Sequence, residues 1–153
     1  MADLNFAGSY DGLHLPYSPE AEQAVLGAII LESDTFDKVV DTLKSPDYFY
    51  VSLHKLIFAQ MQEMIGFGLS IDFVTLLEKL KQNKAFDETT GKTYLMDLVN
   101  NCPSISNAEE YAKIIAEKYN VRRLITASRE IIDDATAGTV SYTHLTLPTN
   151  SRV

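Results

Sequence analysis

Tryptophan is absent from this chain of 153 residues, and cysteine occurs only once, as Cys102. A single cysteine excludes a disulfide within the chain and a metal site built on several thiolates. No apolar run approaches the roughly 20 residues that a membrane-spanning helix requires, and the first residues lack the basic and apolar regions of a secretory signal. We therefore expect a soluble, cytoplasmic protein in which Cys102 is reduced and partly buried.

Basic residues are also scarce, since 13 lysines and arginines face 21 acids and the net charge is −8. A protein that binds nucleic acid by itself usually carries a basic stripe, because its cations displace the counterions of the phosphates. The charge therefore predicts that any DNA contact belongs to another domain or arises only in an assembly.

The sequence has no complete nucleotide-binding loop. Gly91-Lys92-Thr93 matches the end of the pattern G-x-x-x-x-G-K-[ST], but Phe86 stands where the first glycine is required. We expect Gly91 to end the preceding turn and Lys92 to begin a helix.

The histidines and acids do not form a recognisable catalytic or metal-binding pattern. His14, His54 and His144 fall in the leader, a predicted helix and the C-terminal tail, without H-x-x-x-H spacing. We expect His54 to be a packing residue with one hydrogen bond. Asp133 and Asp134 are interpreted as solvated surface. The sequence thus predicts no catalytic, cofactor-binding or metal-binding residue in this chain.

What the sequence does contain is helix signals. Ser18 suits an N-cap and Pro19 the first helical position, and apolar residues recur at three- and four-residue steps behind them. No long stretch alternates with a period of two, so the predicted class is all-α. The predicted helices are 19–31, one capped by Ser33 or Asp34 and stopped by 45–47, 52–65, one capped by Asp72, a short one after Gly91, and 107–135.

The last predicted helix is about 40 Å long, which exceeds what a compact head of this size needs. Its apolar seam has the seven-residue spacing of helices that pair lengthwise. Two interpretations stay open: the head covers the seam, or the helix is one arm of a protruding hairpin that pairs with a second subunit. The seam consists of Ile114, Val121, Ile125, Ser128, Ile132 and Ala135, with Lys118 interrupting it.

Both ends of the chain differ from its middle. Residues 1–17 have no apolar period and are predicted to be a flexible leader. Residues 141–153 contain no acid and resemble the translation of sequencing-adapter read-through. We expect this tail to be non-native, the alternative being a native strand or linker, and the domain itself to cover 18–137.

Several strings of the sequence stand in the order that is typical of one protein family. Residues 18–28 contain the A-E-x-A-V-L-G string of the family's opening helix, and 47–58 resemble its aspartate-phenylalanine turn and histidine-bearing helix. Residues 71–76 look like its D-x-x-T-L cap and 91–95 like its G-x-x-Y-L turn. Residues 107–115 and 122–125 are similar to its long helix. Together these strings, over about residues 16 to 137, resemble the N-terminal domain of DnaB-type replicative DNA helicases.

The resemblance implies a collar domain in which a helical head is followed by a hairpin. In that family, hairpins pair, three such dimers form a collar above a hexameric ring of ATPase domains, and the collar docks primase. The ring is an ATP-dependent helicase that moves 5′ to 3′ on single-stranded DNA. The residues that the resemblance assigns to primase docking are Tyr94, Ile125 and Ile131.

The family's second hairpin arm and its ATPase domain, which uses ATP and Mg²⁺, have no counterpart in these residues. We therefore expect a truncated hairpin and a chain that is monomeric or weakly dimeric. Two alternatives stay open: a free-standing adaptor related to the helicase-binding domain of primase, and a small enzyme whose site the sequence does not reveal.

Overall fold

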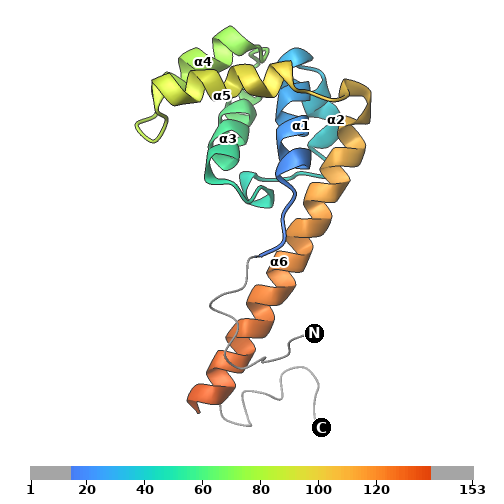
Figure 1. The fold of residues 1–153 in the computed structure, drawn as a ribbon, viewed down its shortest axis with the longest axis vertical. Coiled ribbons are helices and arrows are strands. Elements are labelled where there is room, and N and C mark those ends of the chain that lie inside the picture. Colours follow the sequence, from blue (N-terminus) through green and yellow to red (C-terminus); the bar gives the residue numbers. More distant parts are fainter. Residues whose placement is uncertain (1–14, 139–153) are drawn as a thin grey trace. The chain divides into compact units, whose positions relative to one another are not determined.

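The computed structural model describes residues 15–138. Most of the predicted leader, the whole predicted non-native tail, His14 and His144 lie outside these residues. Within them every regular element is a helix, which confirms the all-α class (Figure 1). The elements are α1 (Pro19–Leu31), α2 (Thr35–Val39), η2 (Pro46–Tyr48), α3 (Ser52–Gly66), α4 (Phe73–Lys81), α5 (Glu88–Asn100), η3 (Ile105–Asn107) and α6 (Ala108–Ala137).

The chain divides into two compact units, with a boundary inside α6. We call Pro16–Tyr119 the head and Asn120–Ala137, the remainder of α6, the arm. Helix α6 has 30 residues, which corresponds to about 45 Å. No helix in the described part of the chain is both long and apolar enough to cross a membrane.

Helix α1 is the central element of the head and has the bounds that the sequence predicts. The Ser18 hydroxyl accepts a hydrogen bond from the Ala21 amide at 3.2 Å, and Pro19 occupies the first turn. All residues from Ala24 to Ile30 are buried, because α1 packs against α2, α3, α4 and α5. Burial on all sides explains why α1 has an apolar surface that is broader than one stripe.

The core of the head is formed by large apolar side chains from several helices. Each such side chain contributes about 1.5–3 kcal/mol when it is fully buried. The aromatic rings of Phe49 and Phe58 are both fully buried in it, with centroids 4.9 Å apart. The largest fully buried apolar side chains are Phe49, Phe58, Leu26, Ile29, Leu43, Ile57, Met61, Met64, Leu76, Leu80, Leu95 and Ile115.

Two buried glycines allow close packing around α5. A Cβ atom on Gly27 of α1 would lie 2.4 Å from the backbone oxygen of Leu98 in α5. A Cβ atom on Gly91 would lie 2.3 Å from the Phe86 ring. The prediction that Gly91 ends a turn before the helix is wrong: α5 already begins at Glu88, and Gly91 lies inside its first turns, where the Phe86 ring leaves no room for a Cβ atom.

Helix α4 confirms the predicted cap at Asp72. Its carboxylate accepts a hydrogen bond from the Thr75 amide at 2.8 Å, and the Thr75 hydroxyl accepts one from the Asp72 amide at 3.1 Å. This reciprocal pair is a capping box. It fixes the start of α4 and thereby the position of Leu76, Leu77 and Leu80, which α4 buries in the core.

Candidate functional site

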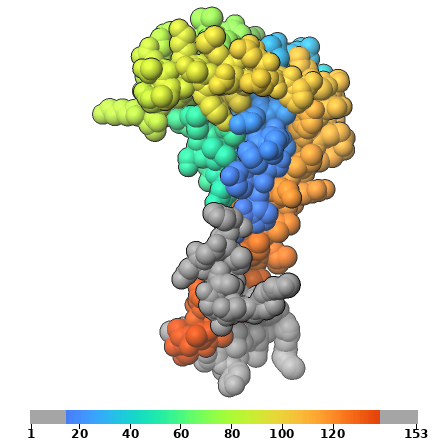
Figure 2. Space-filling model, in the orientation of Figure 1, coloured from blue at the N-terminus to red at the C-terminus, as the bar shows by residue number. Residues whose placement is uncertain are grey.

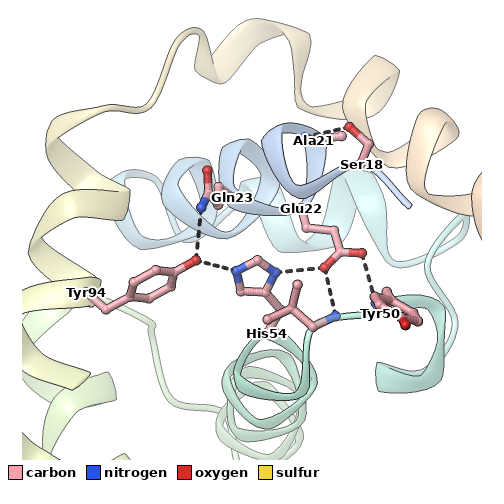
Figure 3. A network of polar contacts seen from close by, with 8 residues as sticks. Ser18, Ala21, Glu22, Gln23, Tyr50, His54 and Tyr94 are labelled. Carbon is pink, nitrogen blue, oxygen red and sulfur yellow. Dashed lines mark hydrogen bonds and ion pairs between the residues drawn. The ribbon is translucent and has the colours of Figure 1, made fainter. Parts of the chain in front are cut away.

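A buried carboxylate and a buried imidazole meet inside the head. Glu22 of α1 is 1% exposed and His54 of α3 is 0% exposed. His54 Nδ1 and Glu22 Oε1 are 2.7 Å apart (Figure 3). Burying a charged group is costly unless it is paired and hydrogen-bonded, so this contact explains why both polar side chains are tolerated among apolar neighbours.

Glu22 also caps α3 from another helix. The residue before α3, Val51, has no side chain that could accept a hydrogen bond. Instead, Glu22 Oε2 accepts the Tyr50 amide at 2.8 Å and Oε1 accepts the Val51 amide at 3.3 Å. A carboxylate at a helix N-terminus is favoured by the helix dipole and satisfies amides that have no partner in the helix. Glu22 therefore fixes the start of α3 relative to α1.

The other nitrogen of His54 extends the contacts towards α5. His54 Nε2 lies 2.6 Å from the Tyr94 hydroxyl oxygen, and this oxygen also accepts a hydrogen bond from Gln23 Nε2 at 3.0 Å. The Tyr94 ring is stacked near the imidazole, with centroids 5.8 Å apart and planes inclined by 28°. Glu22, Gln23, His54 and Tyr94 form one connected group, which we call the polar cluster (Figure 3).

The polar cluster borders a groove between α1 and α5. The half-buried Tyr94 and the exposed Gln23 belong to both the cluster and the groove wall. The groove has a volume of about 400 Å³, and Figure 2 shows atoms of α1 (blue) and α5 (yellow) next to each other on one face of the head. Its other lining residues are Glu20, Ala24, Asp97, Leu98, Asn101 and Pro103.

The cluster can orient side chains, and its chemistry is that of a structural network. Glu22 accepts from three donors, both nitrogens of His54 have partners, and the Tyr94 oxygen has two neighbours. The expectation that His54 has one hydrogen bond is wrong, because the imidazole lies between α1 and α5 and contacts both. Glu22 was not predicted as a member of this cluster, because an acid in the first turn of a helix is commonly explained by the helix dipole alone.

A second candidate surface lies on α6, where the sequence predicts the pairing seam. Ile114 in the head part of α6 is 39% exposed. On the arm, Val121 is 45% exposed, Ser128 is exposed, and Ile125 and Ile132 are half-buried. Two apolar residues beside that seam are more exposed still, Leu124 at 67% and Ile131 at 62%. Five exposed residues of the arm follow one another at alternating steps of three and four. We call them the arm stripe: Val121, Leu124, Ser128, Ile131 and Ala135.

The described residues give little evidence for metal binding or for a reactive cysteine. Among residues 15–138, no group of three histidine, cysteine or acidic side chains could hold a metal ion. Cys102 is partly buried, as predicted. Its burial raises the pKa of the thiol above the ordinary value, which lowers the share of the reactive thiolate at neutral pH.

Comparison with known proteins agrees with this fold and with the motif order. Residues 14–117 match the family model of the DnaB-like helicase N-terminal domain. The chain belongs to this family. The resemblance of the sequence strings is thereby confirmed, and the polar cluster acquires a family context: Glu22, His54 and Tyr94 come from three different strings that carry the resemblance.

Curated and solved relatives support the assignment. The replicative DNA helicase DnaB of Pasteurella multocida is 36% identical over 120 residues, which are 78% of this chain and 26% of that protein. The chain thus spans about a quarter of such relatives. The crystal structure of the N-terminal domain of DnaB helicase from Mycobacterium tuberculosis is 30% identical, with a TM-score of 0.80, and the match covers 86% of this chain and 94% of that one.

A further solved structure shares the fold of this DnaB-like N-terminal domain. That structure is described as the structure of a DnaB-like replicative helicase and its interactions with primase. It is 24% identical, has a TM-score of 0.67, and the match covers 78% of this chain and 28% of that one.

Proposed function

We propose that this chain acts as the collar domain of a replicative DNA helicase, where it contributes to hexamer assembly and docks primase during DNA replication. The observation that carries the assembly role is the arm stripe, which leaves Leu124 and Ile131 more than half exposed. Large exposed apolar groups at heptad spacing are typical of a helix that pairs with another helix. The proposed parent protein is an ATP-dependent 5′–3′ helicase of the cytoplasm.

Pairing of the arm is proposed to occur with the arm of a second copy, as one half of a dimer of hairpins. The predicted seam members Ile125 and Ile132 adjoin the stripe and are half-buried. A helix whose apolar surface extends past one stripe suits contact with two neighbouring helices rather than one. In the proposed assembly, one neighbour would be the second arm of the same hairpin and the other would be the partner copy.

Primase is the proposed second partner. A helicase with this fold has been studied in its interactions with primase. The residues proposed for docking are Tyr94 on the head, which borders the α1–α5 groove, and Ile125 and Ile131 on the arm. Hydrolysis of ATP with Mg²⁺ and contact with single-stranded DNA are assigned to a motor domain of the parent protein, in keeping with the net charge of −8 here.

The assembly role is tested by a matched pair of charge substitutions on the arm. Leu124→Glu places a carboxylate in the stripe, whereas Thr126→Glu places the same charge on an exposed position outside it. The arm has about 27 Å of helix, so we expect weak dimers, measured by sedimentation velocity over a range of concentrations. Leu124→Glu should abolish the dimer and Thr126→Glu should retain it. Equal behaviour of the two variants, or a tight hexamer of this chain, contradicts the proposed pairing.

The docking role is tested separately with the C-terminal domain of the primase encoded in the same genome. Tyr94→Ala, Ile125→Ala and Ile131→Ala should each weaken binding at least tenfold in isothermal titration calorimetry, as expected for anchor residues of an interface. Thr126→Ala is the control and should bind like the wild type. If all three variants bind as tightly as the wild type, these residues do not dock primase.

A further inference from the structure

The polar cluster determines where the hydrogen atoms of its members lie. The Glu22 carboxylate can only accept, so His54 Nδ1 donates to it over 2.7 Å. In the neutral imidazole, Nε2 is then the acceptor, and the Tyr94 hydroxyl donates to it over 2.6 Å. Gln23 Nε2 donates to the Tyr94 oxygen over 3.0 Å. In this assignment the Nδ1 hydrogen of His54, the hydroxyl hydrogen of Tyr94 and one amide hydrogen of Gln23 each have an acceptor.

The hydroxyl of Tyr94 is therefore already engaged inside the head. Its proton is donated to a residue that is 0% exposed, and its oxygen also receives the Gln23 amide. The part of Tyr94 that remains for a ligand is its ring, which is half-buried and borders the groove. Two hydrogen bonds and the stacked imidazole hold that ring in one orientation (Figure 3).

We infer that His54 is a positioning residue for partner docking, although it is too deeply buried to touch a partner. Glu22 orients the imidazole, the imidazole holds the Tyr94 hydroxyl, and the ring is presented at the α1–α5 groove in its bound orientation before any partner arrives. Ordering a side chain in advance removes an entropic cost from association. This inference rests on the proposed docking of primase at Tyr94 and adds that the ring, rather than the hydroxyl, makes the contact.

The test is a double-mutant cycle on binding of the same primase domain. Tyr94→Phe keeps the ring and removes the hydroxyl, whereas His54→Gln keeps a side chain that can still bond to Glu22. Each should weaken binding by about fivefold to tenfold, the size of one lost ordering contribution. The double variant should bind no more weakly than either single variant, because both remove the same link. Additive losses overturn the inference, as does wild-type binding by His54→Gln.

A second cycle uses Gln23, because this residue is exposed and its replacement leaves the core intact. Gln23→Ala should weaken binding in the wild-type background and have no further effect in the Tyr94→Phe background. An equal effect in both backgrounds means that Gln23 touches the partner itself, and the positioning inference then fails. Even if His54→Gln does not fold, this cycle tests whether the hydrogen bonds of the Tyr94 hydroxyl orient the ring for binding.

A spectroscopic measurement tests the network without any partner. In the wild-type chain, the ¹⁵N spectrum of the His54 imidazole should show a single neutral tautomer with hydrogen on Nδ1. A His54 tautomer mixture in the wild type overturns the hydrogen-bond assignment and the inference with it. Failure of this inference is distinguishable from failure of the docking role. If Tyr94→Ala binds primase like the wild type, Tyr94 does not dock primase. If Tyr94→Ala weakens binding but His54→Gln binds like the wild type, Tyr94 docks primase without being positioned by His54.

Discussion

The contact between α1 and α5 makes Gly27→Ala the sharpest test of the packing. The added Cβ atom would lie 2.4 Å from the Leu98 oxygen and 3.3 Å from the Cys102 Cβ. A backbone carbonyl cannot rotate away as a side chain can, so the two helices must separate. Overpacking of this kind costs about 1–3 kcal/mol, and the rigid neighbour indicates the upper end of that range.

The helix propensity of alanine offsets part of this cost. Replacing glycine by alanine inside a helix gains about 0.8–1 kcal/mol, so we expect Gly27→Ala to lower the free energy of unfolding by about 2 kcal/mol overall. For a domain of this size that corresponds to a fall in Tm of about 8 °C. Urea unfolding followed by circular dichroism, with an unchanged m-value, measures the change.

Gly66→Ala is the matched control for this substitution. Gly66 is the exposed last residue of α3, its φ lies outside the left-handed region, and an added Cβ atom would have no neighbour within 4 Å. The same chemical change should therefore be neutral or stabilise by up to about 1 kcal/mol. If Gly27→Ala is as stable as Gly66→Ala, the close approach of α1 and α5 is not a feature of the protein in solution.

Three further predictions concern other parts of the head. Glu22→Ala leaves two backbone amides and His54 without their acceptor and should lower the free energy of unfolding by about 3 kcal/mol in urea titrations. Asp72→Ala removes the cap of α4 and should cost about 1 kcal/mol in the same assay, and a loss below one third of that would contradict the capping role. The raised pKa of the Cys102 thiol predicts slower alkylation by iodoacetamide at neutral pH than for free cysteine. The alkylation rate of Cys102 should still rise at more alkaline pH. A pH profile identical to that of free cysteine would contradict this prediction.

The helices that the sequence predicts best are those with local start signals. The bounds of α1 follow from Ser18 and Pro19, and the start of α4 follows from Asp72, since each of these signals acts within one helical turn. The start of α5 was predicted wrongly, because glycine by itself favours a break. In the structure, the Phe86 ring leaves no room for a Cβ atom at Gly91, which explains why a glycine lies inside this helix.

The spacing of apolar residues does not predict the polar cluster, although the sequence contains one signal for it. Glu22 lies close to the buried Ala21 and Val25 in α1, and His54 is followed by the buried Ile57 and Phe58. An ionisable residue on a buried face must have a polar or oppositely charged partner. Each of these two residues therefore predicts a buried partner of that kind. Which residues pair depends on how α1, α3 and α5 pack, and that is a property of the fold rather than of any one segment.

The polar cluster also constrains how the head can form while the chain is being made. The hydrogen bonds join residues separated by 32, 40 and 71 positions, so none of them belongs to a local turn. At about 5–20 residues per second, translation needs several seconds to proceed from Glu22 to Tyr94. During that interval α1 can form from its own signals, but the carboxylate that later caps α3 stays in water until His54 has been made, and the imidazole has only one of its two partners until α5 leaves the ribosome. Completion of the head is therefore tied to the arrival of α5.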